Sequence, residues 1–470
     1  MKEKRAMIIA PHPDDEINLA GQILPYLQED GYEIYVVYTT NGDSDRKIGN
    51  KRLKEALNAC EVLGIPTNHV IFLGYANEWE KGKHLYNEDY DIQLTSKIGK
   101  TETNSLTDHP EFCYMNNGHH NLFTKTNFIN DLSSVISCFK PEVIICVDFD
   151  THPDHRAATL AFDEAICKIL KEDYKYKPLV LKRFAYNGTW KGIKDYYSYS
   201  KTKLLYGFNY LGGLHELEAP SYSKDDEIRI ISSKKTITSL LSKNPIYKAA
   251  KMHKCTVAWY QMLRVLNSDV VYFLRNTNNL VLHASITSTS GEVNYLNDFK
   301  LYDTKDVLNI SEPFSNIEYC WRPTDIEKTF SVKWNEKVSV KKIIVYEDPN
   351  IFNHIKLLEI SLGSEVVTVE PHNNGSGTTI DLNKEVITDC IRVRVVDYIG
   401  NPGLSEFEVL DSNQKKVIEK LFPLKEYSSI IHNNKISILL EKIILDLKFL
   451  LKFKIKYEIE KRMSYKVKCK

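Results

Sequence analysis

The chain has 470 residues, more than one hydrophobic core usually fills, and its 43% hydrophobic content is sufficient for two cores. Its 62 basic and 62 acidic residues cancel to a formal net charge of zero, so the overall charge gives no indication of a nucleic-acid partner. The nine cysteines lack C-x-x-C spacing, no secretory signal precedes the first apolar strand, and no run is long and uncharged enough to span a membrane. These features together predict a cytoplasmic protein.

Strand and helix patterns alternate through the first part of the chain. Strands are predicted near residues 6–10, 33–39, 69–73 and 142–147, and helices near 16–28, 50–63, 125–138, 155–171 and 246–266. This rhythm predicts an α/β domain over residues 1–275, with a Rossmann-like, mostly parallel sheet.

Metal-binding residue types follow two of these predicted strands at the point where each strand ends. His12 and Asp15 come after the first strand, and His155 comes after the strand at 142–147. Because ligands collect at the carboxyl ends of parallel strands, the two loops are expected to face each other across one crevice. His12 and Asp15 share a face if the chain turns helically after Pro13.

Two imidazoles and one carboxylate would leave a coordination position open for water, as in a catalytic zinc site. Asp14, adjacent to the ligands, is placed to take the proton of that water. His152, one turn before His155, is placed to donate a proton to a leaving group or to bind a developing oxyanion. Taken singly, the Asp14-Asp15-Glu16 carboxylates could merely complement a helix dipole, but the joint occurrence of both motifs favours a metal site.

At these residues the sequence resembles the PIG-L/LmbE-like family of metal-dependent N-deacetylases, which remove acetyl from N-acetylglucosamine units. The resemblance rests on Pro11-His12-Pro13-Asp14-Asp15-Glu16 and His152-Pro153-Asp154-His155, and it covers roughly the first 260 residues. It implies a Zn2+ cofactor, with another divalent metal such as Fe2+ as the alternative, and an amino-sugar substrate. The implied site residues are His12, Asp15 and His155 as metal ligands, Asp14 as general base, His152 as acid or electrostatic catalyst oriented by Asp154, and Arg52 as a substrate contact.

Three stretches depart from the family's pattern. Asn77 stands where the family has an aspartate, Asp150-Thr151 replace a glycine and an aromatic residue, and a late His-Ser-Gln reads His253-Lys254-Cys255. These departures concern the surroundings of the substrate and leave the predicted metal ligands intact.

Two polar stretches could carry further functional residues. The insertion at 76–124 contains His119 and His120, which are either extra ligands or, more commonly for loop histidines, solvated side chains. In the stretch 190–243, tyrosines could stack on sugar rings or simply pack at the surface: Tyr196, Tyr197, Tyr206 and Tyr210.

From about residue 279 the hydrophobic pattern changes to period two, which predicts an antiparallel sandwich over residues 279–412. Its strands are expected at 281–286, 329–334, 338–347, 355–362, 366–370, 390–397 and 404–410. The closing segments, 391–395 and 402–409, resemble the end of a galactose-binding-like (discoidin, coagulation-factor C-type) jelly roll. Such a module either binds a glycan or lipid headgroup or serves for docking.

The segment 413–470 is predicted to be a basic, amphipathic helical tail. Its last 36 residues hold eleven Lys or Arg against four Asp or Glu. Apolar residues recur in it at helical spacing: Ile436, Leu439, Leu440, Ile443, Ile444, Leu447, Leu450 and Leu451. Such a helix fits an anionic membrane surface, which would make the protein peripheral at the inner membrane face, or it packs on protein.

The whole pattern predicts a metal-dependent hydrolase that removes acetyl from an N-acetylated amino sugar. One alternative is a non-heme iron oxygenase, which uses the same two-His/one-carboxylate set but gives Asp14 no role and prefers a β-barrel. The other is a non-catalytic glycan-binding protein, which predicts a degraded metal site. The sugar, its carrier and the oligomeric state are left open.

Overall fold

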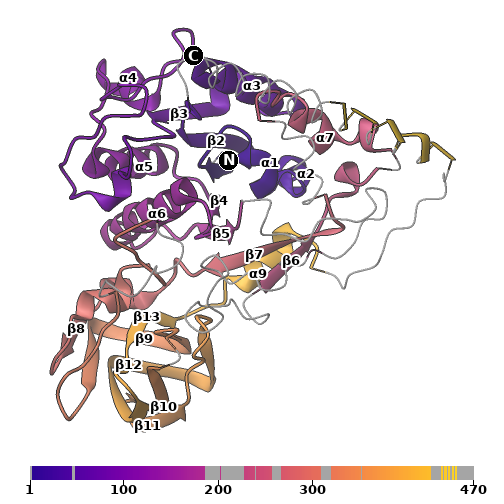
Figure 1. The fold of residues 1–470 in the computed structure, drawn as a ribbon. Coiled ribbons are helices and arrows are strands. Elements are labelled where there is room, and N and C mark those ends of the chain that lie inside the picture. Colours follow the sequence, from indigo (N-terminus) through magenta and orange to yellow (C-terminus); the bar gives the residue numbers. More distant parts are fainter. Residues whose placement is uncertain are drawn as a thin grey trace.

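The computed structural model describes residues 3–44, 48–185, 202, 227–238, 240–256, 266–308, 319–350, 352–424 and scattered helical positions between 436 and 451. Within them, two sheets organise the chain (Figure 1). No helix among these residues has the length and apolar content needed to cross a bilayer.

The first sheet has seven strands in the order β3-β2-β1-β4-β5-β7-β6. Its strands are β1 (Arg5–Ala10), β2 (Glu33–Thr40), β3 (Val70–Tyr75), β4 (Val143–Val147), β5 (Leu179–Arg183), β6 (Glu227–Ile231) and β7 (Asp269–Arg275). Strands β1 to β5 are parallel, whereas β7 is antiparallel to both β5 and β6. The predicted mostly parallel α/β sheet is confirmed, although the patterns at β5, β6 and β7 had not been recognised as strands.

Helices cover both faces of this sheet, with α5 and α6 together on one side and α3 and α7 together on the other (Figure 1). They are α1 (Asp15–Ala20), α2 (Leu24–Glu29), α3 (Ile48–Val62), α4 (Phe112–Asn117), α5 (Lys125–Phe139), α6 (Pro153–Glu172) and α7 (Pro245–Ala250). The apolar strands are buried on both faces, as expected for a sheet with two helical layers.

Two predicted helices differ in the structure. The helix expected at 16–28 is divided into α1 and α2, because Pro25 has no amide hydrogen to continue the helical bonds across residues 21–23. The helix expected at 246–266 ends at Ala250. His253, a few residues further on, turns inward to bond Glu16, which draws the chain away from a helical path; residues 257–265 lie outside the described part.

The second sheet is antiparallel and folds on itself around a separate core. Its strands are β8 (Ser285–Ser288), β9 (Thr329–Glu347), β10 (His354–Leu362), β11 (Glu365–Val369), β12 (Thr378–Ile399) and β13 (Leu404–Leu410). The first half of β9 pairs with β8 and the end of β12, and its second half pairs with β13 and the start of β12. Register shifts in β12 occur where the pairing changes from one half of β9 to the other. They allow β9 and β12 to contribute to both layers of the sandwich.

The predicted sandwich is therefore present, with differences in detail. The two strands expected at 329–334 and 338–347 are one continuous β9, and β12 begins at Thr378 rather than near 390. Residues 280–283 form a short 3-10 turn before β8. Helix α9 (Lys415–Leu421), in the predicted tail, buries Ile418 in the core of the first domain.

A buried ion pair fastens α6 to β5. Lys182 Nζ lies 2.6 and 2.8 Å from the two carboxylate oxygens of Asp163, and both side chains are at most 5% exposed. Lys182 Nζ also donates to Thr159 Oγ1 at 2.7 Å. This pair matters for the site described below because α6 begins at the His152-Pro153-Asp154-His155 motif.

We expect Lys182→Met to lower the free energy of unfolding by about 3–5 kcal/mol, because it leaves the Asp163 carboxylate buried without a partner. Urea unfolding measures the loss. The double variant Lys182→Met/Asp163→Leu should recover much of it, and Lys4→Met, which removes an exposed pair with Asp30, should cost less than about 1 kcal/mol. Equal losses in Lys182→Met and Lys4→Met would contradict the structural role of the pair.

Candidate metal centre

The predicted motifs meet where the strand order of the first sheet reverses, between β1 and β4. These neighbouring strands are parallel and in register, with Ile9 opposite Cys146. The loops that follow them therefore leave the same edge of the sheet side by side. This is the place where open α/β sheets bind ligands.

Three donor atoms form a nearly equilateral triangle at this edge. His12 Nδ1 lies 3.1 Å from Asp15 Oδ2 and 3.1 Å from His155 Nε2, and His155 Nε2 lies 3.2 Å from Asp15 Oδ2. Tetrahedral zinc with metal–nitrogen distances near 2.0–2.1 Å separates its ligand atoms by about 3.3 Å. The donor types and their spacing thus fit one divalent cation bound on one side, with the fourth position open.

The second nitrogen of each histidine is held by a buried carboxylate. His12 Nε2 lies 2.8 Å from Asp154 Oδ2, and His155 Nδ1 lies 2.9 and 2.8 Å from the two oxygens of Asp150. Carboxylates in this position fix ring orientation and raise the basicity of a ligating nitrogen. Asp150 also accepts hydrogen bonds from the backbone amides of His152 and Ala185, at 2.9 and 3.0 Å.

Sequence reasoning gave Asp150 no role and gave Asp154 a different partner. The Asp154 carboxylate had been expected to orient His152, but its Oδ2 is 3.8 Å from His152 Nδ1, too far for a hydrogen bond. Its other oxygen lies 3.0 Å from Nε2 of His84. His84 comes from the insertion at 76–124, and a lone histidine in a polar loop carries no pattern that would single it out.

The charges around the triangle favour ionised Asp15. Burial alone would raise the pKa of Asp15, but the His155 and His12 rings lower it well below its usual range. Burial would likewise lower the pKa of His155, yet Asp150 and Asp15 raise it well above the usual value. The pocket therefore stabilises positive charge at its centre, which is what a cation site requires.

Asp14 lies beside the triangle in an unusual backbone conformation, with φ of 141°. Burial raises the pKa of its carboxyl, and the Arg52 guanidinium opposes that rise. Arg52 Nη2 lies 3.6 Å from Asp14 Oδ1 and donates to Pro13 O at 3.2 Å, while Nη1 donates to Gly42 O at 3.3 Å. Arg52, predicted to contact substrate, thus braces the Asp14 loop. Backbone strain of this kind concentrates at functional sites.

His152 lies at the rim of the site, with its side chain 34% exposed. Its ring meets that of His12 edge to face, at a centroid distance of 4.7 Å. Burial and the neighbouring rings lower its pKa to about 3, so it is neutral near pH 7. Because its Nδ1 accepts the Asp154 amide hydrogen at 3.2 Å, the proton of the neutral ring belongs on Nε2, where it can be donated.

A second donor group, His12 with His152 and His155, has atoms within 4.8 Å of one another. Its spacing is looser than the 3.1–3.2 Å of the triangle that contains Asp15. The tighter set, whose histidines both carry carboxylate partners, is the better metal site.

The remaining predicted histidines lie apart from the triangle. His120 pairs with Glu111 and stacks on Tyr114, and His119 is exposed, so neither joins the metal ligands. His253 bonds Glu16 at 2.7 Å with both side chains buried, which ties the segment after α7 to the first motif. Tyr196, Tyr197, Tyr206 and Tyr210 lie outside the described residues.

Family models match two separate stretches of the chain. Residues 7–166 match the family PIG-L, described as GlcNAc-PI de-N-acetylase, and residues 315–410 match DUF7402, a domain of unknown function. A comparison of the sequence with curated proteins gave no match.

Two solved structures are similar to parts of the chain. N,N'-diacetylchitobiose deacetylase from Pyrococcus horikoshii has 16% identity and a TM-score of 0.25, covering 38% of this chain and 60% of its own. The family 32 carbohydrate-binding module of NanJ from C. perfringens has 16% identity and a TM-score of 0.20, covering 27% of this chain and 94% of its own. Identities and TM-scores this low establish neither substrate nor activity.

We expect Asp150→Asn to weaken divalent-metal affinity by about 10–100-fold, because the amide cannot replace the charge that orients His155. Metal titration of dialysed protein measures this, and His155→Ala, which removes a ligand atom, should hold no metal after dialysis. Asp131→Asn is the matched control, since it changes a buried aspartate bonded to Tyr75 and Asn121 instead. Unchanged affinity in Asp150→Asn would rule out this role, and equal metal content in His155→Ala would remove His155 from the site.

Proposed function

We propose that the protein is a zinc-dependent hydrolase of N-acetylated amino sugars, because residues 7–166 match the family PIG-L, described as GlcNAc-PI de-N-acetylase. Its substrate would be an N-acetylglucosamine-type unit of a cell-surface polysaccharide or glycolipid precursor. The observation that carries the proposal is the triangle of His12, Asp15 and His155, with Asp14 beside it. A cation held there would polarise the acetyl carbonyl and lower the pKa of an attacking water.

The two flanking residues would manage the protons of amide hydrolysis. Asp14, whose pKa burial raises, would accept the proton of the attacking water. His152 would donate a hydrogen bond from Nε2 to the oxyanion of the tetrahedral intermediate and stabilise it. The proton held by Asp14 would pass to the leaving nitrogen, so acetate and the free amine are the products.

The two alternatives are less well supported. An iron oxygenase would use the same three ligands but gives Asp14 no role, and the donors here lie on a parallel sheet covered by helices. A purely glycan-binding protein would not need carboxylates behind both ligating histidines. Fe2+ in place of Zn2+ remains compatible with a hydrolase, since the metal acts as a Lewis acid.

We expect Asp14→Asn to keep its metal but to lose turnover by roughly two to four orders of magnitude, the usual contribution of a positioned general base. Acetate release is measured from free, nucleotide-linked, lipid-linked and polymeric N-acetylglucosamine, together with metal content. Asp30→Asn, an exposed change, serves as control. Loss of metal with activity would make Asp14 a ligand, near-normal turnover would show that no such base is needed, and wild-type protein inactive on every substrate would contradict the proposed activity.

We also propose that the C-terminal helix brings the enzyme to the cytoplasmic face of an anionic membrane. The eight apolar residues of its predicted stripe, from Ile436 to Leu451, are 47–75% exposed. On its polar side, the Glu441 carboxylate accepts hydrogen bonds from the backbone amides of Leu241 and Ser242, at 3.1 and 2.8 Å. An outward apolar stripe among lysines suits the boundary between headgroups and acyl chains.

We expect flotation with anionic liposomes to exceed flotation with neutral ones and to fall with added salt, because binding needs charge as well as the apolar face. Ile443→Ser/Leu447→Ser, on one face, and deletion of residues 435–470 should each abolish it, whereas Ser437→Ala on the same helix should not. Equal recovery with both lipid types, or no change in the deletion, would indicate a helix docked on protein and a substrate that need not be lipid-linked.

A further inference from the structure

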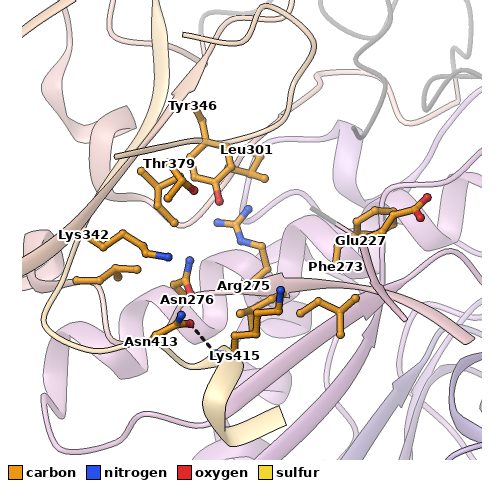
Figure 2. Close-up of a pocket in the computed structure, with 14 residues that line it drawn as sticks. Glu227, Phe273, Arg275, Asn276, Leu301, Lys342, Tyr346, Thr379, Asn413 and Lys415 are labelled. Atoms are coloured by element: carbon orange, nitrogen blue, oxygen red, sulfur yellow. Dashed lines mark hydrogen bonds between the residues drawn. The ribbon is translucent and has the colours of Figure 1, made fainter. Parts of the chain in front are cut away.

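A cavity of about 190 Å³ lies between the two domains (Figure 2). Its walls come from β6 and β7 of the first sheet, from β9 and β12 of the sandwich, and from the start of α9. Arg275, on one wall, pairs with Val180 near the amino end of β5. The metal triangle follows the carboxyl ends of β1 and β4, so the two sites lie at opposite edges of the sheet.

Arg275 is the buried cation of this cavity. The residue is 4% exposed, and it lies centrally among the cavity residues in Figure 2. Its Nη2 donates to Phe299 O at 2.8 Å, and the guanidinium lies over the Phe299 ring, 4.6 Å from the ring centroid. A guanidinium has five N–H donors, so one that lines a cavity can also donate to an acceptor bound there.

Neighbouring carboxylates are engaged elsewhere. Asp163 is bonded to Lys182, Glu406 accepts from the Phe299 amide at 3.0 Å, and Glu408 accepts from Asn276 at 2.7 Å. Their negative charge still acts on Arg275 and raises its pKa above the usual value, although none of the ion pairs found among the described residues includes Arg275. The guanidinium can therefore still donate directly to an anion from outside the protein.

Two lysines add positive charge to the same cavity. Lys342 and Lys415 both line it, and the single lining carboxylate, Glu227, is paired with Arg229 at 2.7 Å. Lys342 Nζ lies 3.2 Å from Asp381, whose side chain is 73% exposed and so competes weakly. Phe273, Leu301 and Leu410 contribute apolar side chains to its walls.

We propose that this cavity binds a small oxyanion-bearing molecule, a sugar or metabolite that carries a carboxylate or a phosphate. The guanidinium and the two ammonium groups would bind the oxyanion, and the apolar side chains of the walls would contact the ring or carbon chain. The volume is below the 300–1,000 Å³ usual for drug-sized ligands, which favours a molecule of monosaccharide size. The site joins the two domains, so its occupant would bind both of them at once.

Isothermal titration of the full chain with glucuronate, inorganic phosphate and glucose tests the proposal. One-to-one binding of glucuronate or phosphate, with glucose at least tenfold weaker, is the expected result. Stronger binding of glucuronate would identify an acidic sugar as the ligand class, and stronger binding of phosphate a phosphate ester. Absence of saturable binding of either anion at millimolar concentration would overturn the proposal.

Variants separate this cavity from the metal centre. Lys342→Gln and Lys415→Gln should each weaken anion binding about tenfold, the usual effect of losing a charge-assisted contact. Lys341→Gln and Lys416→Gln, exposed neighbours that do not line the cavity, should bind within twofold of wild type. Arg275→Lys should also weaken binding, with its thermal melting measured alongside to check the fold.

His155→Ala should bind the anion as wild type does, because the cavity does not involve the metal. Binding that is lost in His155→Ala would assign the anion to the metal centre and overturn the proposal. Anion binding that is unchanged in both Lys342→Gln and Lys415→Gln would also overturn the proposal. Neither result depends on whether the protein deacetylates a sugar.

Discussion

The parallel pairing of β1 with β4 is the constraint on which the rest of the site depends. It joins two segments that lie more than 100 residues apart in the chain, and its register sets Ile9 opposite Cys146. Both strands are fully apolar and buried over this stretch, so a slip in register would disturb packing on both faces. Because the strands end at the same level, His12 and His155 meet at 3.1 Å without long or adaptable loops.

Around this meeting point the protein concentrates buried negative charge. Asp15, Asp150 and Asp154 are each at most 6% exposed and lie against two imidazole rings. Burying charged groups is unfavourable unless they are paired, and here each carboxylate is bonded to a histidine or a backbone amide. The arrangement orders the donor atoms in advance, which is the property that distinguishes a preorganised site from a surface cluster of acids.

Much of this could be predicted from sequence, because ligand types at two strand exits are a local pattern. The β-α-β rhythm located the sheet, and the period-two segments located the sandwich. The roles of Asp150, His84 and His253 could not be predicted in this way. Each side chain bonds a residue at least five positions away in the chain, and for His84 and His253 that residue lies on a distant element. Strands β5 to β7 were also missed. In β5 and β6, charged residues interrupt the apolar run by which the other short strands were recognised. His152 caps the start of α6, where its Nδ1 accepts a hydrogen bond from the backbone amide of Asp154. The carboxylate of Asp154 instead bonds His12.

His84 has a consequence for how this protein could diversify. The insertion at 76–124 borders the metal triangle, where loop changes would alter what the site binds. Through Asp154, however, this loop also shares in holding a candidate metal ligand, since one carboxylate is bonded to both His84 and His12. Replacing the whole loop would therefore weaken the support of His12 at the same time as it changed specificity. Evolution or engineering can therefore vary this loop freely only if His84 is retained. A loop without it would need another hydrogen-bond donor for the Asp154 oxygen that His84 bonds.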